Sequence, residues 1–289
     1  MIYDDKQSLL LVTGLSLKDI GKILNQKNIE KKLRKIGKKY LDRYLTFKKY
    51  KQLTFEEKLK EPIIPIIAAL PCIGKTTMAR EVATAFGIGN VIGGDNFRAA
   101  LREFVSKEKN PEFFTSVYQS WKFFGKENKE NILKGFQAQA RIINKVMERI
   151  ITDRGIRDGE SMVVEYLQFL PSQYNKEVLK HPSVIPIVLN LNSEEIWRER
   201  IKLRVKKTHL KGGTQRLLDA LNKYKIMQEY LCSQAKKYKI PIVTTDNWKK
   251  SVQEVLDIIL KRVKKLNTLK SREKELEIVK KLKIERGEK

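Results

Sequence analysis

The residues of this chain best suited to chemistry form one short run, Gly74-Lys75-Thr76-Thr77. An uncharged, β-branched run precedes it at 63–70, and a helical pattern of apolar residues follows it. Backbone N–H groups of such a loop and the positive end of the next helix face one point, which predicts an anion site. We expect Lys75 to reach the β- and γ-phosphates of ATP and Thr76 to place its hydroxyl on Mg²⁺.

This loop departs from the usual phosphate-loop pattern at one position. The glycine expected five residues before Gly74 is Ala69, which needs a negative φ and more room. A chance Gly-Lys-Thr in a surface turn is the alternative, but the position between a buried strand and an amphipathic helix favours a nucleotide site. The residues expected around the phosphates are Pro71, Cys72, Ile73, Gly74, Lys75, Thr76 and Thr77.

Two acidic residues follow expected strands. Asp95 comes after the apolar run at 90–94, and Glu165 closes the run at 161–165. Ligands of open parallel sheets bind at the carboxyl ends of the strands, so both carboxylates should face the loop. We expect Asp95 to orient an acceptor hydroxyl or a magnesium water, although an aspartate there also suits a helix N-cap. Glu165 is expected to act on Mg²⁺ or its water shell, together with Thr76.

A first pair of arginines follows Asp95. Arg98 and Arg102 are four residues apart and therefore share one helix face. Two guanidiniums on one face suit a bidentate grip on a phosphate or carboxylate, which predicts contacts to an anionic acceptor.

A second pair, Arg200 and Arg204, lies one turn apart in a basic helix that ends before Gly212-Gly213. The basic helix, the glycines and a second helix near Thr214 predict a helical lid. Closure would bring Arg200 and Arg204 onto the transferring phosphoryl group as catalytic cations. A solvated basic face is the alternative interpretation.

These residues need a sheet to position them. From residue 62 onward short apolar strands alternate with longer helical patterns, which predicts an α/β core with a five-stranded parallel sheet and helices on both faces. A long aromatic and mostly helical region, 95–154, should build the acceptor side of the cleft. The expected strands are 63–70, 90–94, 161–165, 184–189 and 240–244.

Three units are expected along the chain. Residues 1–61 form a small helical module, with helices at 6–13, after Ser16 and from about Ile29. Its turn at 13–16 resembles a helix-turn-helix, although such turns are common without DNA. Residues 62–262 form the kinase-type core, and 263–289 form a basic helix that is expected to be solvated.

Composition narrows the class of protein less than the motifs do. The 289 residues include 60 basic and 34 acidic ones, and a net charge of +26 attracts polyanions such as nucleotides, phosphorylated metabolites or nucleic acid. A lysine- and glutamate-rich composition is also typical of hyperthermophile proteins. Two cysteines and two histidines exclude a disulfide framework and a histidine metal centre. No long apolar run or signal peptide is evident, so we expect a cytoplasmic protein.

Read together, these residues resemble the archaeal 2-phosphoglycerate kinases over about 66–260. The resemblance implies ATP- and Mg²⁺-dependent phosphorylation of 2-phosphoglycerate to 2,3-bisphosphoglycerate. It also implies an N-terminal module similar to a small nucleotide-sensing domain. We expect substrate contacts from Asp95, Arg98, Arg102, Tyr118, Glu165 and Gln168. The marks of the resemblance are Gly74-Lys75-Thr76-Thr77, Val91-Ile92-Gly93-Gly94-Asp95-Asn96-Phe97-Arg98, Thr115-Ser116-Val117-Tyr118-Gln119-Ser120-Trp121, Gly135-Phe136 with Gln139, Val164-Glu165 through Leu170-Pro171, Arg200 with Arg204, and Tyr230-Leu231.

The chain departs from that family at four positions. Ala69 and Cys72 stand where glycines are usual, a change that the phosphate loop can absorb. Tyr166 and Gln168 stand where the family usually has a glycine and a histidine, next to Glu165. The acceptor is therefore left open, with an inositol phosphate or RNA as alternatives to 2-phosphoglycerate.

Overall fold

The computed structural model of the protein describes residues 6–207 and 214–268, with the side chains of 205–207 left aside. One sheet of five parallel strands has the order β2-β3-β1-β4-β5. All five predicted strands are present, so the predicted α/β fold class is confirmed. Their bounds are β1 (Ile64–Ala68), β2 (Asn90–Gly93), β3 (Met162–Tyr166), β4 (Val184–Asn190) and β5 (Ile242–Thr244).

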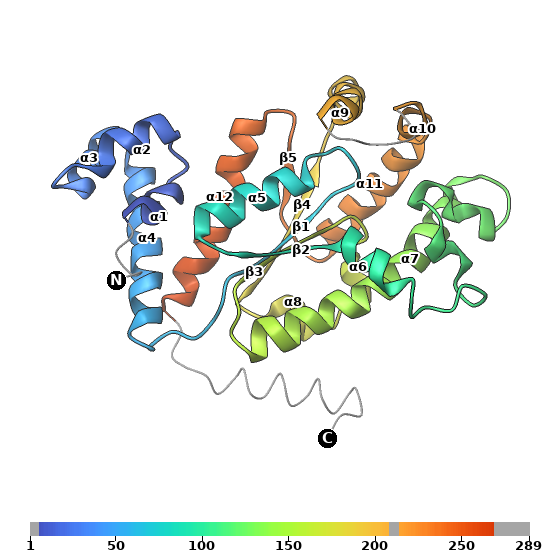
Figure 1. The fold of residues 1–289 in the computed structure, drawn as a ribbon, viewed down its shortest axis with the longest axis horizontal. Coiled ribbons are helices and arrows are strands. Elements are labelled where there is room, and N and C mark those ends of the chain that lie inside the picture. Colours follow the sequence, from blue (N-terminus) through green and yellow to red (C-terminus); the bar gives the residue numbers. More distant parts are fainter. Residues whose placement is uncertain (1–5, 208–213, 269–289) are drawn as a thin grey trace.

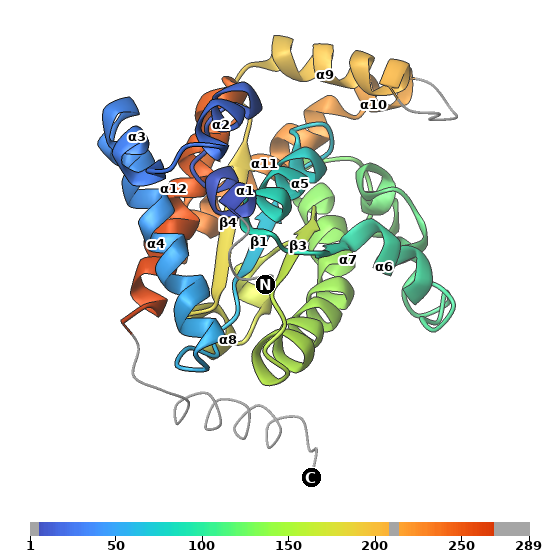
Figure 2. The same cartoon turned by 60° about the vertical axis from the view of Figure 1, so that its left-hand side comes forward.

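Helices cover both faces of this sheet, as Figures 1 and 2 show. Packing on the first face comes from α5 (Lys75–Phe86) and α12 (Trp248–Leu266). Opposite them lie α7 (Lys129–Ile150), α8 (Lys176–Lys180) and α11 (Leu221–Lys237). Every residue of β1 and β3 is buried, as expected for central parallel strands that are covered on both faces.

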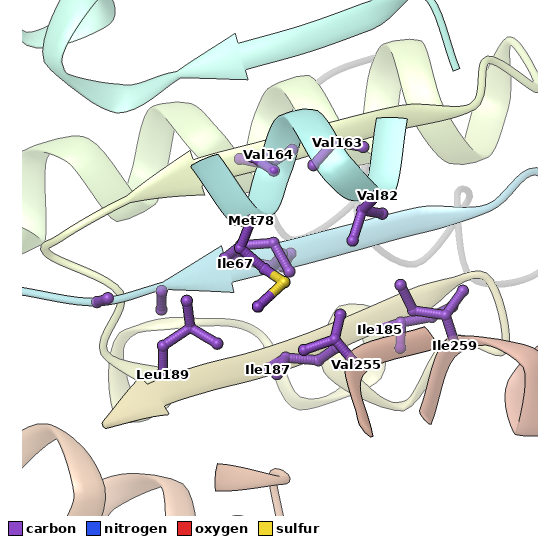
Figure 3. Packing of buried hydrophobic residues seen from close by; sticks show 14 of the residues in the cluster. Ile67, Met78, Val82, Val163, Val164, Ile185, Ile187, Leu189, Val255 and Ile259 are labelled. Atoms are coloured by element: carbon purple, nitrogen blue, oxygen red, sulfur yellow. The ribbon is translucent and has the colours of Figure 1, made fainter. Parts of the chain in front are cut away.

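Figure 3 shows how the first face is filled. Met78 and Val82 of α5 lie against Ile67, while Val255 and Ile259 of α12 lie beside β4. These side chains belong to a hydrophobic cluster that runs through the whole described part of the chain. Because burial of apolar surface is the main stabilising contribution, α5 is anchored along its length and its first turn is held in place.

The pairing register of the strands determines which strand ends lie next to one another. Ile67 of β1 pairs with Glu165 of β3 on one side and with Ile187 of β4 on the other. Gly93 at the end of β2 also pairs with Glu165. The phosphate loop after β1, the Glu165 carboxylate and the start of the helix after β2 therefore share one edge of the sheet.

The N-terminal module has four helices, not the three expected: α1 (Lys6–Leu11), α2 (Leu17–Leu24), α3 (Ile29–Ile36) and α4 (Lys38–Phe55). Ser16 caps α2 as predicted, since its hydroxyl accepts from the Asp19 N–H at 3.2 Å. The third expected helix is split at Gly37, whose backbone is extended between α3 and α4. Periodicity alone did not reveal this break, because apolar residues continue at helical spacing across it.

This module packs on the α/β core through α1 against α5 and α4 against α12. Arg43 joins the two parts: its guanidinium is 4% exposed and donates to Asp257 Oδ1 at 2.8 Å and the Thr13 carbonyl at 2.7 Å. Gln253 Nε2 donates to the Gly14 carbonyl at 2.8 Å. The 13–14 turn thus faces protein, and the boundary expected at residue 61 separates elements that share one hydrophobic cluster.

The remaining described elements connect the strands and the helices that cover them. They are α6 (Gly94–Leu101), η2 (Pro111–Phe114), η3 (Val117–Phe123), η4 (Ile151–Arg157), η5 (Pro171–Gln173), α9 (Glu194–Lys207) and α10 (Gln215–Asp219). The predicted boundary at 262/263 falls inside α12, and 269–289 of the predicted C-terminal helix lie outside the described residues. In 6–207 and 214–268 we find no helix with the length and apolar character needed to cross a bilayer.

Candidate active site

The phosphate loop bends sharply between β1 and α5. Gly74 has φ +112° as the N-cap of α5, and a Cβ there would lie 2.6 Å from the Trp248 ring. Both the conformation and the indole therefore require glycine at this position. Cys72 has φ +65°, a left-handed conformation that is costly for a residue with a side chain.

Lys75, Thr76 and Glu165 meet at the mouth of this loop. The Lys75 ammonium forms an ion pair with one oxygen of Glu165, and both side chains are only 10% exposed. Thr76 Oγ1 donates to the other carboxylate oxygen at 3.1 Å. The three residues predicted to handle phosphate and metal are thus brought together, although they come from α5 and β3, about 90 residues apart in the chain.

The donor set at this point suits Mg²⁺. One hydroxyl and one carboxylate are hard oxygen ligands, and Mg²⁺ in phosphate-handling sites keeps several waters and takes further oxygens from the substrate. In the described residues no group of three or more acidic, histidine or cysteine side chains is arranged to hold a metal. A metal at Thr76 and Glu165 would therefore depend on bound phosphates for its remaining ligands.

Asp95 lies in the first turn of α6, exposed at the same edge. The N-cap of α6 is Gly93, and Asp95 makes no capping bond, so the capping interpretation of Asp95 does not fit the structure. This helix starts directly against β3, because a Cβ on Gly94 would lie 2.2 Å from Tyr166 Cβ. Asp95 is left available to a ligand, and its role stays a prediction.

Arg98 and Arg102 both turn toward the backbone of η2. Arg98 donates to the carbonyls of Phe113, at 3.2 Å, and Thr115, while Arg102 donates to Phe113 O at 3.4 Å. Burial lowers the pKa of Arg98 to about 10, with a further decrease from Arg102 and an opposing increase from Asp95. Arg98 Nε is buried without a hydrogen-bond partner, so one donor of the fork is still unused.

Tyr166 at the end of β3 and Gln168 just after it differ in whether their polar groups are hydrogen-bonded. Gln168 is 0% exposed, and neither its amide nitrogen nor its oxygen has a hydrogen-bond partner. Tyr166 is buried as well, but its hydroxyl shares a hydrogen bond with that of Tyr174, and burial raises the pKa of both phenols. Of the two residues that depart from the family beside Glu165, only Gln168 has unsatisfied hydrogen-bonding groups.

The two predicted lid arginines lie in α9 but differ in their contacts. Arg200 donates to the Ile73 carbonyl at 2.7 Å and to Thr245 O at 2.5 Å, and burial lowers its pKa. Arg204 is exposed, with its guanidinium 3.8 Å from Cys72 Sγ. Arg200 therefore holds the phosphate loop, and Arg204 lies at its rim. The predicted lid segment at 208–213 is outside the described residues.

Residues that the sequence did not single out also support the loop. Thr245 is fully buried just after β5, and its hydroxyl accepts from Arg200 and lies 3.2 Å from the Ile73 carbonyl. Trp197 Nε1 donates to the Pro71 carbonyl at 2.9 Å. Thr245 follows a strand end, so the rule that found Asp95 would also have found it, whereas Trp197 has no such signal.

No model of a known protein family matches the chain. It is 31% identical over 194 residues to the mevalonate-3-phosphate 5-kinase of Thermoplasma acidophilum, covering 67% of this chain and 94% of that protein. The 2-phosphoglycerate kinases of Methanopyrus kandleri and Methanocaldococcus jannaschii are 27% and 28% identical, over 82% and 85% of this chain and 71% and 81% of theirs.

Among solved structures, a gluconokinase from Sinorhizobium meliloti 1021 aligns with a TM-score of 0.36 and 14% identity, over 71% of this chain and 94% of its own. The sequence relatives are more informative than this likeness, because one of them exceeds 30% identity and is matched along nearly its whole length. The chain therefore belongs to a family of archaeal kinases that includes this mevalonate-3-phosphate 5-kinase and the 2-phosphoglycerate kinases, and it is a phosphotransferase.

Proposed function

We propose that the protein transfers the γ-phosphoryl group of ATP to a hydroxyl of a small phosphorylated metabolite, with Mg²⁺ as cofactor. The observation that carries this proposal is the cluster of Lys75, Thr76 and Glu165 at the phosphate loop. When ATP occupies the loop, the Lys75 ammonium is placed to bind the β- and γ-phosphates, and Thr76 with Glu165 to hold Mg²⁺. Bound Mg²⁺ neutralises charge that builds on the phosphates.

The acceptor class follows from the chemistry that the relatives' substrates share. Their names specify 2-phosphoglycerate and mevalonate 3-phosphate. Both compounds carry a carboxylate, a phosphate monoester and a primary hydroxyl. We propose a phosphorylated hydroxy acid of this kind, with conversion of 2-phosphoglycerate to 2,3-bisphosphoglycerate as the first candidate.

Different side chains around the loop have different proposed roles in this reaction. We propose that the carboxylate of Asp95, exposed in the first turn of α6, orients the acceptor hydroxyl and accepts its proton. Arg204 lies at the rim of the loop beside Cys72, and its proposed role is to stabilise charge on the transferring group. Arg200 positions the loop through Ile73 and Thr245. Arg98, Arg102, Tyr118 and Gln168 belong to the acceptor side.

A screen of acceptors in one buffer tests the proposal. ADP formation would be measured with ATP, Mg²⁺ and, in turn, 2-phosphoglycerate, mevalonate 3-phosphate, an inositol phosphate and RNA. Glycerate and mevalonate serve as matched acceptors without the phosphate, and the Lys75→Met variant gives the background. We expect turnover with a phosphorylated hydroxy acid and a loss of that turnover in Lys75→Met.

Phosphorylation of RNA in this screen would favour a different function, that of an RNA kinase. The motivation is the net charge of +26. RNA phosphorylation would weaken steeply between low and moderate salt, with a slope set by the number of phosphates contacted, whereas a small acceptor shows a shallower dependence. Turnover of RNA with none of the small acceptors would contradict the acceptor class.

A further inference from the structure

A groove of about 350 Å³ lies beside the acceptor side of the cleft, between η3 and the α10 and α11 helices. In Figure 1 these elements form the right-hand side of the molecule, where the green segment after α6 approaches the orange α10 and α11. Tyr118, Trp121 and Lys122 line the groove from η3. Arg216 and Lys223 line it from the opposite side.

Two cations in this groove have no counterion. Glu127 is occupied by an ion pair with Lys223 at 2.7 Å, and Asp219 accepts a hydrogen bond from Gln215. Arg216 and Lys122 have no hydrogen-bond or ion-pair partner among the residues that the structure describes. The groove is lined by three cations and two carboxylates, so it keeps an excess of positive charge.

An indole donor in the wall of the groove is also unsatisfied. Trp121 Nε1 is buried and has no partner in the described chain, although a buried N–H normally has one. A guanidinium and an ammonium that line one groove are a combination that binds anions, because each donates charge-assisted hydrogen bonds to oxygen atoms.

A row of aromatic rings connects this groove to the phosphate loop. The Tyr118 ring meets the Tyr224 ring edge-on at 5.9 Å, and Tyr224 stacks on Trp197 at 6.4 Å. Trp197 donates to the Pro71 carbonyl in the loop itself. Burial raises the pKa of Tyr224, and Arg204 and Arg216 both oppose that increase, so the two guanidiniums act on one phenol from different helices.

We infer that this groove is the subsite for the phosphate monoester that the acceptor already carries, with Arg216 and Lys122 as its charged groups. The inference rests on the proposed function, because it requires a phosphorylated acceptor. Arg216 was not among the residues that the sequence indicated.

The test uses the Arg216→Ala/Lys122→Ala double variant of the full chain. Loss of two charge-assisted contacts is expected to raise the KM for a phosphorylated hydroxy acid by roughly tenfold to a hundredfold. The KM for ATP and the turnover of the unphosphorylated analogue are expected to stay unchanged. Arg216→Lys keeps a charge and should recover part of the loss. The matched control is Arg154→Ala. It removes an exposed arginine of η4 that forms an ion pair with Asp158.

The outcomes separate this inference from the proposed function. An unchanged KM for an acceptor that the wild type phosphorylates overturns the subsite and leaves the kinase assignment intact. Equal losses for phosphorylated and unphosphorylated acceptors assign the groove to the carboxylate and overturn the inference. If the wild type phosphorylates no such acceptor, calorimetric titration with inorganic phosphate decides: binding that the double variant loses supports the subsite, and equal binding overturns it.

Discussion

The two sides of the cleft differ in how their polar groups are satisfied. On the phosphate side, Lys75 and Thr76 bind Glu165, and Arg200 binds the Ile73 and Thr245 backbone. In the region that we propose binds the acceptor, several buried side-chain atoms lack a partner in the described structure. They are Arg98 Nε, Trp121 Nε1, Gln139 Oε1, Asn144 Oδ1 and both amide atoms of Gln168.

The two sides of the site therefore differ in whether their polar groups are paired before a ligand binds. The phosphate side is complete without a ligand, because its internal ion pair keeps Lys75 and Glu165 in position. The acceptor side holds donors and acceptors that cost free energy while they are unpaired, so a bound substrate or ordered water must complete it. Specificity is then set mainly where polar groups are still unpaired.

The largest expected effect comes from a substitution on the phosphate side. Lys75→Met removes the cation that we propose stabilises the developing charge on the γ-phosphate, and this change should lower kcat by roughly a hundredfold or more. It also leaves the Glu165 carboxylate buried beside Thr76 with no ion pair, so the free energy of unfolding should fall by about 3 kcal/mol. Steady-state kinetics and chemical denaturation measure the two effects.

The Lys75→Met/Glu165→Gln double variant separates these two consequences. With both charges removed, stability should recover most of the loss while activity stays absent. If Lys75→Met has the stability of the wild type, the ion pair adds nothing to the fold. The phosphate side would then not be preorganised by it.

The phosphate side is also the part that the sequence predicted best. Strand alternation located β1 and β3, and the rule that sites lie at strand ends was sufficient to bring Lys75, Thr76 and Glu165 together. The contacts of Arg98 with the Phe113 and Thr115 carbonyls could not be predicted, since they depend on how a segment without regular periodicity folds back over α6. The same holds for Arg200, whose partner Thr245 is 45 residues away.

On the acceptor side we expect the next largest effect from Arg98→Lys. Lysine keeps the positive charge but lacks the planar guanidinium group. In Arg98 this group donates to the Phe113 and Thr115 carbonyls, and its Nε has no hydrogen-bond partner in the described structure. The KM for the acceptor should rise by about tenfold with the KM for ATP unchanged, in keeping with a loss of about 1.5 kcal/mol of charge-assisted bonding. A wild-type KM for the acceptor in Arg98→Lys, measured beside an Arg154→Lys control, would remove Arg98 from the substrate contacts.

Gln168→Leu tests whether the unpaired groups are costly in the absence of a ligand. Leucine fills a similar space without polar atoms, so the ligand-free protein should gain about 1 kcal/mol or more in free energy of unfolding, while acceptor binding weakens. Gln139→Leu is the matched control, because Gln139 Nε2 already donates to the carbonyls of Glu112 and Thr115 and its loss should destabilise. Equal destabilisation by both variants would mean that Gln168 has a partner, such as ordered water.

The smallest effect we predict concerns strain on the phosphate side, at Cys72. Its φ of +65° is unfavourable for any residue with a Cβ, so Cys72→Gly and Cys72→Ala should differ although both remove the sulfur near Arg204. We expect the glycine variant to exceed the alanine variant in stability by about 1 kcal/mol, since relief of a left-handed conformation outweighs the extra freedom of glycine in the unfolded chain. Thermal unfolding of the two variants measures this difference, and kcat should stay within about threefold of wild type because the loop N–H groups keep their direction. An alanine variant as stable as the glycine variant would show that the loop holds this conformation without strain, and the phosphate side would then be preorganised by its hydrogen bonds alone.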